Sequence, residues 1–440
     1  MVDTASLFTT LAQSTSPEIA RRLRDLVGTA PDAGLNRINP LRFAAEHGFS
    51  ERDSIAAFLH GTRLGLFELG WNLLCRSCAG TLHAGASLRE IDQARYSCTF
   101  CALDTEPTLD ESIEVTFTVS PRVRKIAAHD PESLALWDYA RQIYWSSAMD
   151  LPEGLNSLMG DAILDAVELP ALNSTKRRIS LPKGTVIVFD PVSHAGQFIE
   201  VDDKATDQPQ QLAVGLNDAH GQRAPVALHQ GPLDLVLENA TSHRTLPIVW
   251  AAGDSLMELM ERRLPFLTAK RLLTHQTFRD IYRTDVLDID QRFKITSLTF
   301  LFTDLKSSTE LYERIGDLAA YDLVRAHFRA LTGIVAEEGG AIVKTIGDAV
   351  MATFPTPRQG LSAALRMRAA IDEMNRRSNR DDLRLKIGLH EGPCLAVTLN
   401  ERQDYFGQTV NIAARLQSLL AQQGADLGIA DDGVGAEDGA

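Results

Sequence analysis

Hydrophobic and polar residues follow different patterns in different parts of this 440-residue chain. The sequence up to about residue 110 predicts helices, separated by turn signals at GTAPDAGLN and EHGFSERD. Residues 111–252 contain short apolar and β-branched runs bounded by turn residues, as in IEVTFTV, GTVIVFDP and LDLVLEN. This second pattern predicts a mostly β domain of the sandwich or barrel type.

One helix is expected to interrupt these strands, over DPESLALWDYARQIYWSS (130–147), because Asp and Pro begin it and apolar residues follow near helical spacing. Its aromatic residues Trp137, Tyr144 and Trp145 either pack in the core, the commoner fate of such side chains, or line a ligand pocket. The charged amphipathic stretch that follows, 253–290, predicts two helices broken at Pro265. Such a linker either transmits a regulatory state or serves as a passive spacer.

The last domain, predicted at 291–425, alternates between strands and helices. A strand at 298–302 precedes a helix at about 309–338, jogged at Gly316, and the hairpin formed by AIVKTI and AVMATF. A second helix at about 357–377 and the strands LRLKIGLH and CLAVTL complete the pattern. The order βαββαβ predicts a ferredoxin-like sheet backed by helices, so the chain is expected to be an α+β multidomain protein.

Composition and charge narrow the class of protein. Apolar residues make up 44% of the chain, as in globular proteins, and the net charge of -14 repels nucleic acid and anionic membranes. No apolar stretch approaches the roughly 20 residues that span a bilayer. The N-terminus also lacks the basic region and apolar run of a secretory signal. We therefore expect a cytoplasmic protein with no membrane segment and no nucleic-acid partner; a DNA-binding regulator is the minor alternative.

Four of the five cysteines form two Cys-x-x-Cys pairs separated by nineteen residues. They are Cys75, Cys78, Cys98 and Cys101. This spacing is typical of a zinc ribbon, in which four thiolates close a tetrahedral site. The sequence predicts one structural Zn²⁺ at 75–101, because a site with four thiolates leaves no open position for catalysis. Coincidental core cysteines would not be expected to form two such pairs.

Two acidic residues lie at comparable places in the last domain. Asp304 follows the strand SLTFLFT, and Asp348 lies in the Gly-Asp turn of the hairpin. In a ferredoxin-like sheet the first strand and the second strand of the hairpin are antiparallel neighbours, so these carboxylates are expected to lie close together. They would repel each other unless a cation lay between them, and the simplest interpretation of Asp304 is a metal ligand.

Three stretches, FTDLKSSTELYERIGD, GGAIVKTIGDAVMATF and DYFGQTVNIAARLQS, resemble the catalytic domain of class III nucleotidyl cyclases, the adenylate and guanylate cyclases. The resemblance runs from about Lys294 to Leu420, with the motifs in the family's order. The preceding segment resembles the regulatory half of a bacterial subgroup, with a winged-helix-like start within 1–110, a zinc ribbon and a β domain. The implied activity is intracellular signalling through conversion of ATP to 3',5'-cyclic AMP and pyrophosphate.

The resemblance implies that Asp304 and Asp348 bind two Mg²⁺ or Mn²⁺ ions in each active site. It places base selection on Lys344 and Asp404. A lysine donor and an aspartate acceptor complement the N1 acceptor and 6-amino donor of adenine, whereas guanine presents the opposite pattern, so ATP is the expected substrate.

By the same resemblance, Asn411 orients the ribose, and Arg415 meets the negative charge that builds on the α-phosphate. The two residues lie four positions apart and share one helix face. In the family the metal-binding acids come from one domain and the other four residues from its partner. A chain that carries both sets once is therefore expected to form a C2 homodimer with two composite sites.

The sequence departs from the family after Leu420. The family continues with a strand, a helix and two final strands, one of which carries a lysine for the triphosphate. Here GADLGIA predicts one strand, and the tail, 426–440, ends in DDGVGAEDGA, acidic and rich in glycine, without a lysine. We therefore expect a catalytic domain that is C-terminally incomplete. The alternative to an active cyclase is a silent or partner-dependent module that binds nucleotide or dimerises.

Overall fold

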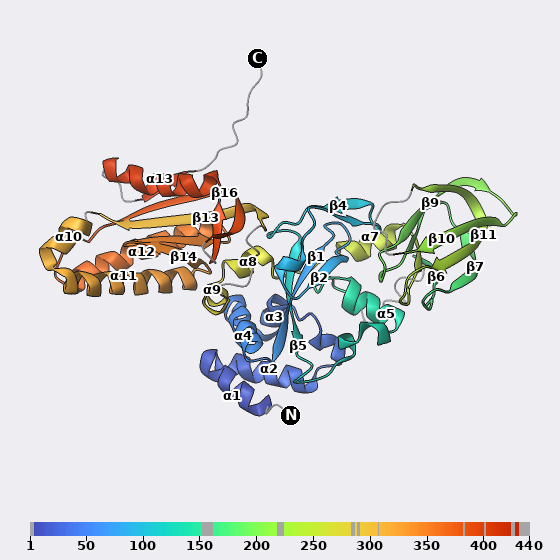
Figure 1. The fold of residues 1–440 in the computed structure, drawn as a ribbon, viewed down its shortest axis with the longest axis horizontal. Coiled ribbons are helices and arrows are strands. Elements are labelled where there is room, and N and C mark those ends of the chain that lie inside the picture. Colours follow the sequence, from blue (N-terminus) through green and yellow to red (C-terminus); the bar gives the residue numbers. More distant parts are fainter. Residues whose placement is uncertain are drawn as a thin grey trace, which may run out of the picture. The chain divides into compact units, whose positions relative to one another are not determined.

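The computed structural model describes residues 4–151, 162–217, 224–282, 287, 291–306, 308–381, 383–399, 402–423 and 427–430. The chain forms two compact units (Figure 1). The first, here called the N-terminal unit, comprises Met1–Ala86, Gln93–Pro107 and Ser112–Leu267. The second, the catalytic unit, comprises Ser87–Asp92, Thr108–Glu111 and Thr268–Ala440. Two short segments that precede residue 112 therefore belong to the catalytic unit.

The N-terminal unit begins with helices, as predicted, but the prediction of helices up to about residue 110 is wrong from Phe67 onward, where strands begin. The helices are α1 (Thr4–Ser14), α2 (Pro17–Thr29), α3 (Pro40–His47) and α4 (Glu51–Arg63). The side chain of Asn39 caps α3 by accepting hydrogen bonds from the N–H groups of Leu41 and Arg42. A three-stranded antiparallel sheet follows, in the order β2 (Thr81–Gly85), β1 (Phe67–Leu74) and β5 (Ile113–Val119).

Strands predicted within 111–252 are present, but IEVTFTV forms β5 of the three-stranded sheet. The later strands form a seven-stranded sheet in the order β10-β11-β9-β8-β12-β6, with β7 also paired to β11. Its strands are β6 (Ile163–Ala166), β7 (Ser174–Leu181), β8 (Gly184–Phe189), β9 (Gly196–Ala205), β10 (Gln210–Leu216), β11 (Val226–Asn239) and β12 (Ile248–Ala251). The long strand β11 pairs with β9 over its first residues and with β7 and β10 further on, which folds the sheet around a core of valine, leucine and isoleucine.

The prediction of a single helix at 130–147 is wrong. The structure has a short α5 (Leu136–Tyr139) that continues as a π-helix, Ala140–Tyr144. Tyr144 and Trp145 are buried in an aromatic core with Phe189 and Trp250, as core packing predicts, and Trp137 packs against the same core. In this stretch the large aromatic rings provide the buried apolar surface that a regular apolar stripe provides in a long helix. In the described part of 253–290, the chain likewise forms three short helices rather than two, α7 (Asp254–Glu261), α8 (Ala269–Leu273) and α9 (Gln276–Ile281).

The ferredoxin-like order predicted for the last domain is confirmed. The sheet runs β14 (Ala341–Ile346), β15 (Ala349–Phe354), β13 (Phe293–Leu305), β16 (Leu385–Leu399) and β17 (Arg402–Phe406), and β18 (Leu427–Ala430) pairs with β16. The helices are α10 (Ser308–Ile315), α11 (Asp317–Glu337), α12 (Pro357–Arg377) and α13 (Gln408–Gln423). The predicted jog between α10 and α11 is confirmed at Gly316, which has a φ of 80°.

LRLKIGLH and CLAVTL form the single strand β16 rather than two strands. Pro393, which has no N–H to donate, lies where β13 bulges between Ile295 and Leu298, so the ladder continues past it. Helices cover both faces of the sheet: a Cβ at Gly388 would lie 2.4 Å from the carbonyl oxygen of Ala413 in α13, whereas the next residue, Leu389, packs against Gly360 in α12.

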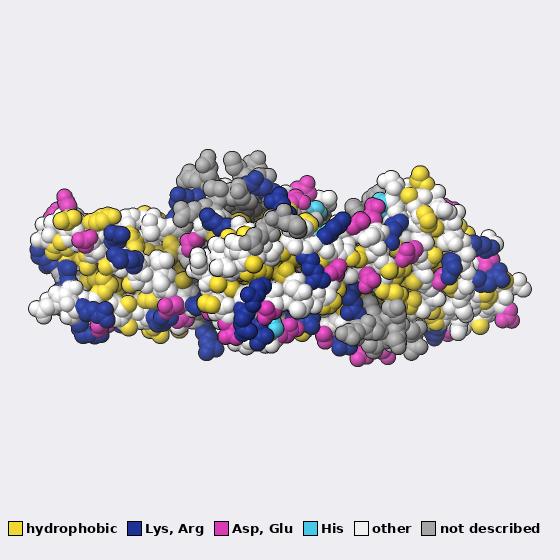
Figure 2. Space-filling view, turned by 90° about the horizontal axis from the view of Figure 1, so that it is seen from below, with side chains coloured by type: hydrophobic (Ala, Val, Ile, Leu, Met, Phe, Trp, Pro, Cys, Tyr) yellow, Lys and Arg dark blue, Asp and Glu magenta, His cyan; other side chains and the backbone are white. Residues whose placement is uncertain are grey.

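The surface carries both signs of charge. On the face shown in Figure 2, lysine and arginine side chains are interspersed with aspartate and glutamate. Apolar side chains also gather on this face over the catalytic unit. Within the described residues, no helix is long and apolar enough to cross a membrane.

Candidate active site

Asp304 and Asp348 come together at one end of the central strands. Asp304 lies inside β13, one residue before its end, rather than after the strand as predicted, because β16 pairs with β13 as far as Leu305. Asp348 lies in the β14–β15 turn, where Gly347 takes a φ of 63°. Oδ2 of Asp348 accepts a hydrogen bond from the N–H of Leu305 at 3.3 Å. Two acidic side chains thus converge from neighbouring strands.

Lys386 is a third charged residue at this place. It is paired in register with Asp304 across β13 and β16, and its Nζ lies 2.9 Å from Oδ2 of Asp304. The side chain of Lys386 is only 14% exposed. Lys386 is not among the site residues predicted from the sequence, although a lysine inside the apolar run LRLKIGLH indicates a charged partner.

Two further groups report on the electrostatics of the site. Burial, helped by the charges of Asp348 and Asp304, raises the pKa of Tyr312 on α10. Burial also lowers the pKa of His327 on α11 to about 4, against an opposing effect of Asp348, so this imidazole is neutral at neutral pH. His327 therefore brings no positive charge to the two carboxylates, and Lys386 compensates only Asp304 directly. Negative charge is left over, and a divalent cation would balance it.

Lys344 and Asp404 form an ion pair, with Nζ 2.5 Å from Oδ2. They lie on β14 and β17, the two ends of the five-strand path, so the sheet must curl to bring them into contact. The ring contact between Tyr405 and Phe300 of β13, with centroids 5.5 Å apart, fits this curvature. The side chain of Asp404 is 10% exposed and that of Lys344 is 43% exposed. The carboxylate of the pair is therefore nearly buried, whereas the lysine reaches the surface.

Helix α9 holds the backbone on both sides of this pair. Nη2 of Arg279 donates to the carbonyl oxygens of Val343, at 3.3 Å, and Gln403, at 3.0 Å. These are the residues directly before Lys344 and Asp404. Oε1 of Gln276 accepts a hydrogen bond from the N–H of Ile342 at 2.8 Å. Sequence reasoning missed Arg279 because its targets are main-chain carbonyls, which leave no pattern in the sequence.

Asn411 and Arg415 lie one turn apart on α13, and both are exposed. Among the described residues, neither forms a hydrogen bond or ion pair with the two aspartates or with the Lys344–Asp404 pair. One chain thus presents two acids, a lysine–aspartate pair, and an exposed asparagine and arginine that bond directly to neither.

Comparison with known families divides the chain in two. Residues 1–280 match a family of unknown function, DUF5939, and residues 291–425 match the adenylate and guanylate cyclase catalytic domain. The chain belongs to the DUF5939 family and carries a class III cyclase catalytic domain. The expected cyclase resemblance is therefore confirmed.

Individual cyclases match part of the chain. Adenylate cyclase 2 of Rhizobium meliloti is 34% identical over 132 residues, which cover 27% of this chain and 36% of the relative. Adenylate cyclase of Anabaena cylindrica is 28% identical over 150 residues, 31% of this chain and 30% of the relative. Guanylate cyclase 32E of Drosophila melanogaster is 28% identical over 133 residues, which cover 28% of this chain and 11% of the relative. The chain thus spans about a third or less of the length of these relatives.

Among solved structures, the adenylyl cyclase CyaB from P. aeruginosa is 27% identical to this chain. The match covers 29% of this chain and 74% of that structure, with a TM-score of 0.27.

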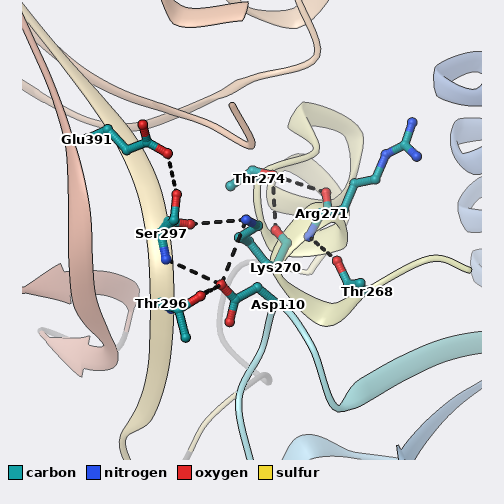
Figure 3. Close-up of polar contacts among 8 residues, drawn as sticks. All are labelled: Asp110, Thr268, Lys270, Arg271, Thr274, Thr296, Ser297 and Glu391. Carbon is teal, nitrogen blue, oxygen red and sulfur yellow. Dashed lines mark hydrogen bonds and ion pairs between the residues drawn. The ribbon is translucent and has the colours of Figure 1, made fainter. Parts of the chain in front are cut away.

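A polar cluster fastens the start of the cyclase sheet to residues from the DUF5939 region (Figure 3). Oδ2 of Asp110 accepts hydrogen bonds from the N–H and hydroxyl of Thr296 and from the N–H of Ser297, at the β13 bulge. Nζ of Lys270, on α8, donates to the carbonyl oxygen of Ser297 at 3.0 Å and lies 3.9 Å from Asp110. The hydroxyl of Ser297 donates to Glu391 of β16. The cyclase fold is thus completed by residues outside the matched cyclase domain.

The four cysteines of the two pairs come together in the N-terminal unit. The Sγ atoms of Cys75, Cys78, Cys98 and Cys101 all lie within 4.8 Å of one another, and the first three cysteines are buried. Hydrogen bonds from the neighbouring thiols, that of Cys101 first, lower the pKa of Cys75, which favours a thiolate. The backbone N–H of Gly80 donates to Sγ of Cys78 at 3.3 Å. Four converging sulfurs fit a tetrahedral Zn²⁺.

Proposed function

We propose that this protein is an adenylate cyclase, which converts ATP to 3',5'-cyclic AMP and pyrophosphate. The observation that carries this proposal is the Lys344–Asp404 pair, held in a cyclase domain that also brings Asp304 and Asp348 together. A nucleotide must present an acceptor to the lysine and a donor to the aspartate, and adenine does so with N1 and its 6-amino group. Guanine would leave both side chains mispaired.

The Lys344–Asp404 pair has a further consequence. The two side chains are joined directly at 2.5 Å, so a bound base has to enter between them. It then replaces their mutual contact with its own hydrogen bonds to the lysine and to the aspartate. Because Asp404 is nearly buried, a base that failed to satisfy it would leave an unpaired carboxylate in a site of low polarity. The energetic difference between adenine and guanine is therefore concentrated at this acid.

Asp304 and Asp348 are the proposed ligands of two Mg²⁺ or Mn²⁺ ions, since oxygen donors suit these cations. The ions would supply charge neutralisation of the triphosphate and a lowered pKa of the ribose 3'-hydroxyl. Lys386 now neutralises Asp304, so a cation bound at Asp304 would compete with its amine for this carboxylate. We assign the Lys386 amine to the phosphates as a donor.

The reaction needs no covalent intermediate with the protein. The 3'-oxygen bonds to the α-phosphorus as its proton leaves to solvent, and the bond from the α-phosphorus to the oxygen of the departing pyrophosphate breaks. Asn411 would orient the ribose, and the guanidinium of Arg415 would stabilise the charge that grows on the α-phosphate. Both side chains are exposed on α13, so they are available to a nucleotide held by another chain.

A C2 homodimer would supply these groups to one another. Apolar side chains flank the base-selecting pair: Ile346, at the end of β14, is 57% exposed, and Phe406, at the end of β17, is 66% exposed. Such residues gain from being covered by a second copy. In this arrangement, Asp304 and Asp348 of one copy face Lys344, Asp404, Asn411 and Arg415 of the other.

The test is production of cyclic nucleotide by the purified chain with Mn²⁺, from ATP and from GTP. Turnover of ATP should exceed turnover of GTP, disappear in Asp348→Ala, and persist in Asp322→Ala, which removes an exposed acid of α11. A folded, dimeric protein without turnover would instead support the alternative of a silent or partner-dependent module.

A further inference from the structure

The N-terminal unit contains a cavity of about 460 Å³ that is separate from the cysteine cluster. It is lined by α2, by the segment from residue 33 to α3, and by the π-helix and the residues that follow it. Its charged lining residues are Arg37, Arg42, Arg141 and Glu46. Three positive charges against one negative charge are unusual in a chain whose net charge is -14. The cavity is therefore a local positive site in an acidic protein.

Among the residues that the structure describes, Arg37 has no carboxylate partner. Its Nη1 donates to the hydroxyl of Thr81 at 3.0 Å and to the carbonyl oxygen of Ile143 at 2.6 Å. Within the described part of the chain, Nε and Nη2 of Arg37 donate to no group. Burial lowers the pKa of Arg37, and the charge of Glu114 opposes this effect only in part. A guanidinium held in such a place gains from an anion that bonds to its open edge.

Glu114 does not fill that role. It is fully buried, and its oxygens accept hydrogen bonds from the hydroxyls of Ser146 and Ser147, both at 2.7 Å, and from the amide of Asn72 at 3.1 Å. Its carboxylate is thus already satisfied by neutral donors. Arg37 and Glu114 interact through their charges without a hydrogen bond between them. Nε and Nη2 of Arg37 therefore remain available to an anion.

The backbone around the cavity is strained in two places. Arg37 takes a φ of 46°, in the left-handed region that residues with a side chain rarely adopt. Arg141 and Gln142 lie on the π-helix, a form that is uncommon and concentrates at functional sites. Each distortion costs free energy, and each places a polar residue on the cavity wall.

Two buried polar atoms of lining residues also lack partners. Within the described residues, Oε1 of Gln142 and Nε1 of Trp145 form no hydrogen bond, although the two residues are only 9% and 2% exposed. An acceptor and a donor left unpaired in a protein interior carry a desolvation cost. Together with the open edge of Arg37, they mark this wall as built for contacts that the chain does not make with itself.

The rest of the lining sets the size and polarity of the occupant. Leu26, Ile38 and Met149 add apolar surface. At the rim, Nε of Arg42 lies 2.7 Å from Oε1 of Glu46, and both side chains are about half exposed, so this pair can open at little cost. We propose that the cavity binds a small organic anion, with a carboxylate or phosphate group on Arg37 and an apolar body against Leu26, Ile38 and Met149. This site does not depend on the proposed cyclase activity.

The test uses anilinonaphthalene sulfonate, a fluorescent anion with an apolar body, as the probe on the full chain. It should bind one to one and be displaced by decanoate or decyl phosphate, but not by decanol, which has the same chain length without charge. The relative potency of decanoate and decyl phosphate distinguishes the two head groups. Displacement by decanol as strong as by decanoate would overturn the proposal.

Variants locate the site. Arg37→Met should weaken probe binding by about tenfold, the effect of losing one charge-assisted contact. Arg42→Gln, at the half-exposed rim, should weaken it less and keeps the test valid if Arg37→Met does not fold. Arg24→Met removes an arginine of α2 that is 57% exposed and should leave binding unchanged. Unchanged binding in Arg42→Gln and in a folded Arg37→Met, or equal loss in Arg24→Met, would refute the assignment.

Discussion

Nζ of Lys386 lies 2.9 Å from Oδ2 of Asp304, on two strands that are paired in register at these residues. The amine therefore neutralises the carboxylate at which we propose that a divalent cation binds. Cation binding and this ion pair would then compete for the same carboxylate. The competition makes Lys386 a determinant of metal affinity as well as of charge.

Lys386→Met should raise the affinity for Mn²⁺ in the absence of nucleotide by roughly three- to tenfold, because the competing charge is gone. Titration of Mn²⁺ followed by electron paramagnetic resonance measures this directly. Turnover of ATP should fall in the same variant, since the phosphates lose a donor. Lys183→Met, which removes a lysine that is 67% exposed, is the matched control. Weaker Mn²⁺ binding in Lys386→Met would contradict the competition.

The double variant Lys344→Glu with Asp404→Ser should shift preference from ATP toward GTP. Glutamate accepts from N1–H and the 2-amino group of guanine, and serine donates to O6. The expected result is a loss of at least tenfold in kcat/KM for ATP, with a smaller loss or a gain for GTP. Parallel kinetics with both nucleotides measure the ratio. Equal losses with both nucleotides would mean that these residues support the fold rather than select the base.

Some of this site could be predicted from the sequence, and some could not. Asp304 and Asp348 follow from chain order, because consecutive elements of a ferredoxin-like sheet have fixed neighbours. Lys386 lies 82 residues beyond Asp304, and only the register of β13 with β16 pairs them. That register in turn depends on the bulge opposite Pro393, a detail of hydrogen bonding that no periodicity predicts.

Replacing Cys98 by serine should abolish binding of one zinc per chain and lower the thermal midpoint of the N-terminal unit by several degrees, because metal binding stabilises the fold. Zinc content by atomic absorption and a thermal scan are the measurements. Cys394→Ser is the control: this buried cysteine is not part of the four-sulfur cluster and should retain the zinc. Full zinc content in Cys98→Ser would show that the four sulfurs do not hold the ion together.

The stability of the β domain should fall as the pH drops below about 4. Hydrogen bonds from Arg178 and Lys176 lower the pKa of Asp234 to about 2, whereas in the unfolded chain its pKa is near 3.8. The native state therefore binds fewer protons between these values, and the stabilisation that is present above pH 3.8 is lost as the pH falls toward 2. Asp234→Asn should flatten this part of the profile, as measured by thermal midpoints between pH 5 and pH 2.5. If the pH profile of Asp234→Asn equals that of the wild-type chain, other carboxyl groups cause the acid sensitivity.

Arg279→Met should reduce selection between ATP and GTP, although Arg279 does not contact the base. Its Nη2 joins the carbonyl oxygens of Val343 and Gln403, and these bonds fix the spacing between Lys344 and Asp404. Without these two hydrogen bonds the strands can separate, and the binding free energy lost on mispairing a base becomes smaller. The expected result is a higher KM for ATP and a ratio of ATP to GTP efficiency that falls several-fold, with partial recovery in Arg279→Lys, which keeps a donor.

Two comparisons separate this positioning role from a general loss of stability. Arg329→Met removes an exposed arginine of α11 and should leave the nucleotide ratio unchanged. Competition between ATP and GTP for a fluorescent nucleotide measures selection without turnover, so it gives an answer even if the chain proves to be catalytically silent. A folded Arg279→Met protein that loses activity but keeps the wild-type ratio in both assays would show that Arg279 anchors α9 without setting the spacing of the Lys344–Asp404 pair.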